Sequence, residues 1–462
     1  MSDTQSAYGT VRPSSLRSGE LRAKARAVAP AARGLLLGMW VLMLFQPEWL
    51  LASFGGRALL TRIPTILLPF LLLAAYNHRR REAIYWPFAV IMAIHVVHLP
   101  FVENRGRLFS VFENLYFYFF VFVASVCLVR RARDMSWLLS AYLFQFGWFG
   151  LMGVASGQVS WHTTLSNPDS YGPLMGIGIG YAYYYGMGSR RSGLRRAAFG
   201  IAAICLVGVV SSLARGAVLS AAAVLALIWA RSPRKLATAA AGVAAAVVIA
   251  VAVSLVHPQG AFVAEMKTVS EGTESGTGLQ RWVVWGIAMQ LFWMHPVLGV
   301  GPANLGPTAA ALIPDDPHRP MYSDIDTMWG FTPHNIFVEV LSEQGIVGAA
   351  AFLAMIVGFF TTLRRLRARN AVRAWNHAVR GRLDLRAVTL GLECAMVAFL
   401  CNGIFYNQLY EHWLWSMCAL AYTLALVVRR AAAEQAAEDA PAAAVRGAAA
   451  PRGSSILRAR RG

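Results

Sequence analysis

The sequence predicts an all-α integral membrane protein with about twelve transmembrane helices and one long polar loop. Three observations lead to this fold class. The mean hydropathy is +0.49, with 57% hydrophobic and 14% charged residues, which is typical of a polytopic membrane protein rather than a soluble globular one. Hydrophobic segments alternate with short arginine clusters along the chain. The interval 257–333 is the one long polar stretch that interrupts this alternation.

The hydrophobic segments have the length of membrane spans. A helical span needs about 17–25 mostly apolar residues, because backbone in lipid must satisfy its own hydrogen bonds. On this rule the sequence predicts spans at 34–51, 59–77, 83–101, 108–129, 135–156, 171–188, 197–213, 216–230, 236–256, 334–363, 387–407 and 409–428. Residues 1–33 form a basic segment before the first span and show no signal-peptide cleavage site.

The arginines test this number of spans, since cytoplasmic loops of membrane proteins are enriched in Lys and Arg. With twelve spans, every cluster falls on the side of the N-terminus; the clusters lie at 79–81, 130–133, 190–196, 231–235, 364–386 and 429–430. The pattern predicts a multi-pass protein of the bacterial inner membrane with both termini in the cytoplasm. The loop 257–333 is then periplasmic. We expect the alanine-rich tail, 429–462, to be a disordered cytoplasmic segment.

Net charge and cysteines exclude several classes of function. A formal charge of +19 in a soluble protein would suggest nucleic acid, but here the arginines follow the membrane topology, so we predict no nucleic-acid partner. The five cysteines have no paired spacing and all lie in apolar segments, which predicts neither a disulfide framework nor a zinc site; they are Cys127, Cys205, Cys394, Cys401 and Cys418.

His334 is the leading candidate for a catalytic residue. Thr332 is expected to cap the tenth span and Pro333 to be its first helical residue, which places His334 in the first turn. A helix N-terminus would lower the imidazole pKa, and a neutral imidazole can accept a proton from a hydroxyl. The alternative is a polar residue that only ends a helix at the membrane interface. Glu339 and Glu343 share a different face of this helix and are predicted to be interior polar contacts.

Two arginines on the same predicted side could bind a phosphate. Arg281 begins a predicted short amphipathic helix that ends at Met294, before His295 and Pro296, and its aromatic residues suit the membrane interface. Arg215 lies in a short connection on a side that is otherwise poor in arginine, where an ionisable residue indicates function. Guanidinium groups bind phosphate bidentately. The alternatives are an interfacial arginine that contacts lipid headgroups and a turn residue without a function.

Two other patterns receive simpler interpretations. Carboxylates and one histidine in the polar loop could hold a divalent ion, but several prolines make this segment a stiff, solvated loop, so we predict no metal; these residues are Asp315, Asp316, His318, Asp324 and Asp326. Glycines four residues apart in the sixth span, at Gly172, Gly176 and Gly180, are explained by close helix packing.

Two classes of function remain from this chemistry. One is a membrane transferase that acts on a phosphate-bearing lipid, and the other is a transporter or flippase. A transporter should carry its substrate groups near the middle of the bilayer, within broken and repeated spans. Here the polar residues gather in one asymmetric loop at one face. The pattern therefore favours the transferase.

Several segments resemble the O-antigen ligase and polymerase superfamily. The strongest similarity lies in Gln280–Trp285, in His295–Gly301 with Asn304, and in Pro333–Gly348. Ser211–Gly216 is similar to the short arginine–glycine signature of that family, and Asn167–Asp169 is similar to a weaker element. The motifs together cover roughly 167–348.

The resemblance implies a metal-independent, inverting membrane glycosyltransferase with a GT-C-like helical bundle and no cofactor. It implies an undecaprenyl-pyrophosphate-linked glycan as donor and, in ligases, a lipid A-core sugar as acceptor. In polymerases the acceptor is another lipid-linked repeat unit, and some relatives glycosylate protein. By the resemblance, His334 and Arg281 are catalytic, and Arg215, Arg281 and Asn335 bind the pyrophosphate. One long periplasmic loop, with no second loop of its size, favours the ligase over the polymerase.

Overall fold

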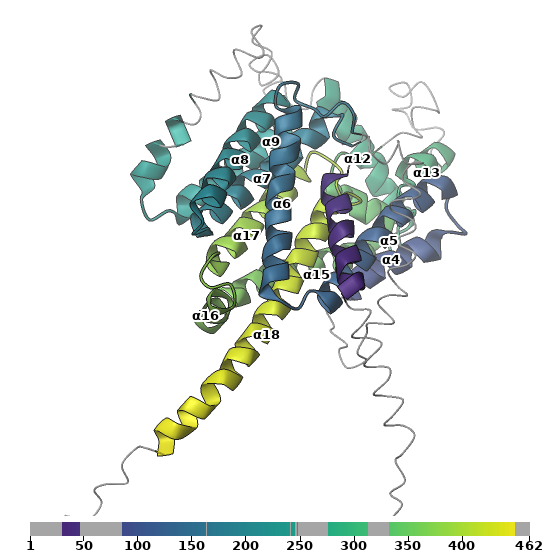
Figure 1. Cartoon of the computed structure of the whole chain (residues 1–462). Helices are drawn as coiled ribbons and strands as arrows, with labels where there is room; N and C mark the ends of the chain where they lie inside the picture. The colour runs from purple at the N-terminus through teal and green to yellow at the C-terminus, as the bar shows by residue number, and fades with distance from the viewer. Residues whose placement is uncertain are drawn as a thin grey trace, which may run out of the picture.

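The computed structural model describes residues 30–46, 86–162, 164–240, 242–244, 247, 276–312 and 332–448. Within these residues the protein is helical and forms no strand, apart from a single bridge between Ser189 and Leu383 (Figure 1). The all-α class predicted from the sequence is therefore confirmed for the described part of the chain.

The helices follow one another with short connections. After a helix at Pro30–Phe45, their order is α4 (Trp86–His98), α5 (Arg105–Leu128), α6 (Ala132–Gly153), α7 (Pro168–Gly188), α8 (Ser192–Ser211), α9 (Arg215–Arg231), α12 (Gly276–Met294), α13 (Leu305–Leu312), α15 (Ile336–Leu366), α16 (Arg369–Ala378), α17 (Leu385–Asn402) and α18 (His412–Ala448).

Five of these helices are long and apolar enough to cross a membrane: α5, α8, α15, α17 and α18. Shorter apolar helices occur at Pro30–Phe45, at α4 and at Lys235–Ala244. The protein is thus a helical membrane protein. The total of twelve spans stays a prediction, because the span at 59–77 and most of the span at 236–256 lie outside the described residues.

The centre of the bundle is built around α7, which packs against α8, α9 and α17. Its glycines make this packing possible, as the sequence predicted. A Cβ atom on Gly180 would lie 2.4 Å from the Cβ of Cys394 on α17, and one on Gly176 would lie 2.7 Å from the Oγ of Ser220 on α9. Close approach of helices across small residues replaces the hydrophobic effect as the source of packing in lipid.

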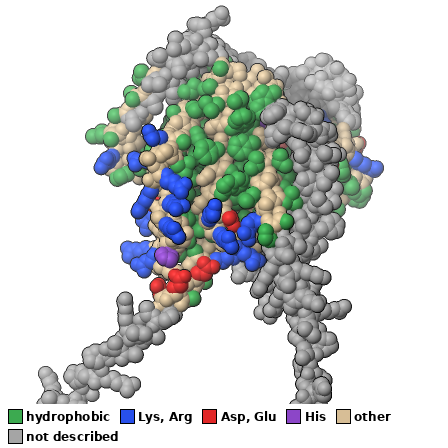
Figure 2. All heavy atoms as spheres, in the orientation of Figure 1, with side chains coloured by type: hydrophobic (Ala, Val, Ile, Leu, Met, Phe, Trp, Pro, Cys, Tyr) green, Lys and Arg blue, Asp and Glu red, His purple; other side chains and the backbone are tan. Residues whose placement is uncertain are grey.

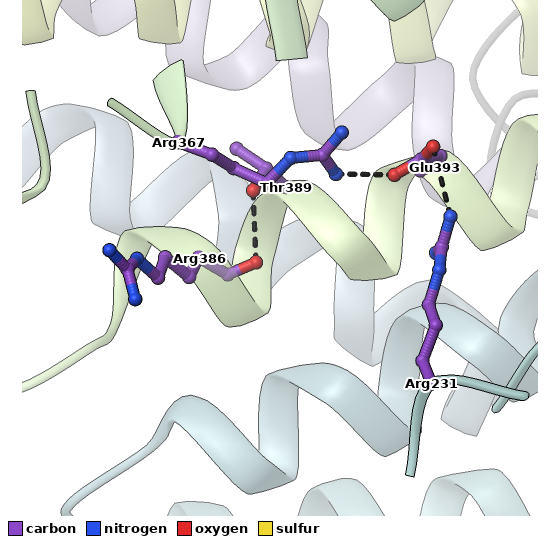
Figure 3. Close-up of polar contacts among 5 residues, drawn as sticks. All are labelled: Arg231, Arg367, Arg386, Thr389 and Glu393. Atoms are coloured by element: carbon purple, nitrogen blue, oxygen red, sulfur yellow. Dashed lines mark hydrogen bonds and ion pairs between the residues drawn. The ribbon is translucent and has the colours of Figure 1, made fainter. Parts of the chain in front are cut away.

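The two ends of the bundle differ in charge. Figure 2 shows Lys and Arg side chains gathered towards the lower end of the face in view, below a hydrophobic surface. At this end Glu393 of α17 lies between Arg231 of α9, at 3.0 Å, and Arg367, which follows α15 (Figure 3). These ion pairs join three helices at the end that the arginine distribution predicts to be cytoplasmic.

The C-terminal segment differs from the expectation. We expected residues 429–462 to be disordered, but α18 continues as a helix to Ala448. Alanine has the highest helix propensity, so an alanine-rich segment that follows a membrane helix can extend it without a hydrophobic face of its own. Residues 449–462 lie outside the described part of the chain.

Candidate active site

The polar loop and α15 are joined at a break in the helix. Gly345 has φ 63° and ψ −165°, so the backbone hydrogen bonding of α15 is interrupted there. The segment after α12 satisfies the exposed backbone groups. The amides of Val300 and Gly301 donate to the carbonyls of Ser342 and Glu343, both at 2.9 Å. In return, the amides of Ile346 and Val347 donate to the carbonyls of Pro296 and Val297, at 2.9 and 3.2 Å.

Glycines are required at this junction because two backbones touch. A Cβ atom on Gly299 would lie 2.4 Å from the carbonyl carbon of Glu343, and one on Gly345 would lie 2.4 Å from the oxygen of Val297. Both residues also have positive φ, which glycine adopts without steric cost. The junction holds the end of α12 against the first half of α15 and so fixes the position of Arg281 relative to His334.

Buried polar side chains reinforce the junction. The carboxylate of Glu343 accepts hydrogen bonds from the Ala303 amide at 2.8 Å and from the Tyr410 hydroxyl at 2.6 Å. Asn304 is fully buried and exchanges hydrogen bonds with the backbone of Asn104, before α5. Glu339 is also buried. The interpretation of Glu339 and Glu343 as interior contacts agrees with this placement.

The start of α15 differs from the sequence prediction. Asn335, not Thr332, is the N-cap: its Oδ1 accepts from the amides of Phe337 and Val338 at 2.9 and 3.2 Å. The helix begins at Ile336, so Pro333 and His334 precede it. The sequence offered two capping residues three positions apart, and asparagine is at least as good a cap as threonine.

His334 is held just outside the helix by its neighbours. The indole of Trp285 on α12 donates to the Pro333 carbonyl at 2.6 Å, and the Ile336 amide donates to the Gly403 carbonyl at 2.6 Å. Between these two anchors His334 has φ 47°, a left-handed conformation that few non-glycine residues adopt. Strained backbone of this kind is concentrated at functional sites.

The pKa of His334 is lowered from its usual value, as the sequence predicted, but for a different reason. Burial is the main cause, because it penalises the charged imidazolium, and the positive charge of Arg281 is the second. The negative charge of Asp169 acts in the opposite direction. The expected effect of the helix N-terminus is not among these causes. The imidazole is thus kept neutral mainly by its surroundings.

Arg281 lies close enough to Asp169 and Arg215 for their charges to interact. Its pKa is lowered, first by burial and also by Arg215, while Asp169 raises it. Arg215 is the first residue of α9, directly after a turn in which Leu213 has φ 58°. Three elements far apart in sequence therefore bring Arg215, Arg281 and His334 into one charged neighbourhood. Arg281 itself is not the first helical residue, as expected, because α12 begins at Gly276.

Two site residues were missed from the sequence. Asp169 lies in the first turn of α7, where Asn167 is the N-cap. Tyr406 lies in the connection between α17 and α18; its ring centre is 6.4 Å from that of His334, and its hydroxyl is 2.5 Å from the Oγ of Ser170. Burial raises the pKa of Tyr406 to about 12, so its hydroxyl stays protonated. Asp169 was visible as part of a motif, whereas no pattern in the sequence marked Tyr406.

A metal site is not formed by the residues that the structure describes. Among them no three His, Cys, Asp or Glu side chains are grouped so that they could hold an ion. The candidates Asp315, Asp316, His318, Asp324 and Asp326 lie outside the described residues.

The arrangement combines two guanidinium groups, a neutral imidazole and a carboxylate at one end of the bundle. Paired guanidinium groups can bind a pyrophosphate and stabilise charge that develops on it. A neutral imidazole nearby can take a proton from an attacking hydroxyl. These are the groups that a transfer reaction with an anionic leaving group requires.

Comparison with known proteins agrees with this chemistry. Residues 200–353, about a third of the chain, match the family model described as O-Antigen ligase. The match includes Arg215, α12, the junction at Gly345 and the His334 segment. No curated protein matches the chain.

Proposed function

The match at residues 200–353 assigns the chain to the O-antigen ligase superfamily of membrane enzymes, and we propose that it is a ligase within it. In this proposal it transfers a glycan from undecaprenyl pyrophosphate to a lipid A-core acceptor. The reaction takes place at the periplasmic face of the bacterial inner membrane. The observation that carries the proposal is the convergence of Arg215, Arg281 and a neutral His334 at the end of the bundle opposite the Arg231–Glu393–Arg367 ion pairs.

The proposed reaction is a single displacement at the anomeric carbon. The acceptor hydroxyl attacks this carbon, a new glycosidic bond forms, and the bond to the pyrophosphate oxygen breaks. His334 accepts the hydroxyl proton, and undecaprenyl pyrophosphate leaves with the bonding electron pair. Attack from the face opposite the leaving group inverts the anomeric configuration.

Arg215 and Arg281 provide the electrostatic stabilisation in this scheme. Negative charge grows on the pyrophosphate as its bond to the sugar breaks, and fixed guanidinium groups stabilise that charge more in the transition state than in the ground state. Arg281 comes from α12 and Arg215 from the start of α9, so the pyrophosphate would lie between them. Asn335 stays a proposed ligand through its amide nitrogen, since its oxygen caps α15.

Asp169 is proposed as a positioning residue. Its charge acts on both Arg281 and His334. A carboxylate beside two guanidinium groups limits their mutual repulsion while the site is empty. The same carboxylate raises the pKa of the base towards the range in which it accepts a proton effectively.

The test is a transfer assay in proteoliposomes. An undecaprenyl-pyrophosphate-linked glycan is supplied together with either lipid A-core or no further acceptor. Product on lipid A-core that is lost in His334→Ala and Arg281→Ala supports the ligase and both roles. His377→Ala on α16 and Arg105→Ala at the start of α5 are matched controls that should retain activity, since both residues are exposed and lie outside the site.

Each other result has a clear meaning. Longer lipid-linked chains as the only product would indicate a polymerase. Movement of the lipid across the bilayer without any product, when this movement depends on the same arginine and histidine, would indicate a flippase and overturn the proposal.

A further inference from the structure

A cavity lies at the basic end of the bundle, far along the chain from the candidate active site. It has a volume of about 160 Å³ and is formed where the end of α15, the start of α16 and the middle of α18 meet. Its lining is Thr362, Arg365, Leu366, Ala371, Ala425, Leu426, Val428, Arg429 and Ala432.

The cavity has an apolar wall and a cationic opening. Leu366, Leu426 and Val428 are buried and line the wall with small alanines. Arg365 and Arg429 also line the cavity but are exposed. An apolar space beside two guanidinium groups is complementary to a molecule with a hydrocarbon part and an anionic part.

The two arginines at the opening differ from their neighbours in their bonding. Arg231 and Arg367 are paired with Glu393, as Figure 3 shows. Among the described residues, the guanidinium groups of Arg365 and Arg429 form no hydrogen bond or ion pair. Their charge is therefore available for an external anion.

The position of the cavity suits a lipid of one leaflet. α15 ends as a candidate membrane span at Leu366, so the opening lies where the helix leaves the apolar region. The amphipathic α16 then follows, with Trp375 buried and its indole bonded to the Leu383 carbonyl at 2.9 Å, while Arg369 and Arg373 are exposed. Basic pockets between helices on the cytoplasmic side of membrane proteins bind anionic lipid headgroups.

We propose that this cavity binds an anionic phospholipid of the leaflet at the basic end of the protein. The phosphate lies between Arg365 and Arg429, and part of one acyl chain fills the apolar space. A cavity of about 150 Å³ accepts an apolar group of the size of benzene. The space of about 160 Å³ therefore accommodates a few methylene groups, and the rest of the lipid lies along the outer surface of α15 and α18.

The experiment measures lipid binding to the purified full-length protein by native mass spectrometry. Phosphatidylglycerol, phosphatidylcholine and inorganic phosphate are added in separate titrations. We expect phosphatidylglycerol to bind more tightly than the other two. Arg365→Gln and Arg429→Gln should each weaken its binding about fivefold, and the double variant about thirtyfold, from the usual contribution of an arginine near an anionic headgroup.

Two further variants separate this site from general attraction to charge. Arg364→Gln removes the same charge from the adjacent exposed residue, which does not line the cavity, and should leave phosphatidylglycerol binding unchanged. Ala371→Leu fills the cavity without any change of charge and should weaken binding. Equal losses in Arg364→Gln and Arg365→Gln would overturn the proposal. Inorganic phosphate that binds as tightly as the lipid would show a simple anion site and would also overturn it.

Discussion

Replacement of Gly345 by alanine should separate the polar loop from α15. At φ 63° and ψ −165° the backbone of Gly345 lies in a region that is essentially restricted to glycine. The added Cβ atom would lie 2.4 Å from the Val297 oxygen, so the two segments must move apart. This movement weakens the hydrogen bonds that join Ile346 and Val347 to the carbonyls of Pro296 and Val297.

The destabilisation follows from these two effects. An alanine in this backbone region costs about 1–3 kcal/mol. Two backbone hydrogen bonds contribute about 0.5–1.5 kcal/mol each, or about 1–3 kcal/mol together. The expected loss is therefore about 2–6 kcal/mol, which is a large fraction of the stability of a typical folded protein.

The assay is unfolding in mixed micelles with increasing SDS, followed by tryptophan fluorescence. Gly200→Ala on α8 is the control, because no atom lies within 4 Å of a Cβ atom built there. In a regular helix alanine is about 0.5–1 kcal/mol more favourable than glycine, so this control should unfold at the same or a higher SDS fraction. Equal unfolding midpoints for Gly345→Ala and Gly200→Ala would refute the reasoning.

Three further predictions concern the pH dependence of transfer and the basic end of the bundle. The neutral base is lost as pH falls through the His334 pKa, which lies below 6.5, so activity should persist to lower pH than an ordinary imidazole allows; a midpoint at or above 6.5 in a pH–rate profile would contradict this. In the same profile, Arg281→Gln should move the acid limb to higher pH, because it removes a positive charge, and Asp169→Asn should move it to lower pH; shifts in the same direction would contradict the arrangement. Glu393→Gln should destabilise the protein by about 1.5–3 kcal/mol because it weakens two charged hydrogen bonds, whereas Arg386→Gln, whose guanidinium points away from Glu393 in Figure 3, should have little effect in the same SDS titration.

Local patterns in the sequence identified most of the candidate residues. Arg215, Arg281 and His334 were chosen from their positions beside hydrophobic segments, and the structure brings them together. Asp169 was noticed only as part of a motif. Tyr406 had no signal, because its relation to His334 depends on how the connection between α17 and α18 folds back over the start of α15.

The sequence by itself determined that the protein is a helical membrane protein, because hydropathy and span length are local properties that the bilayer selects directly. It also indicated the charged end of the bundle through the arginine clusters. Tertiary structure decided which residue caps α15, why the His334 pKa is lowered, and where the cavity lies. Each of these depends on contacts between distant segments, such as the burial of His334 beside Arg281 and the backbone contact between Gly345 and Val297. Periodicity and composition do not encode such contacts, since they arise only when helices pack.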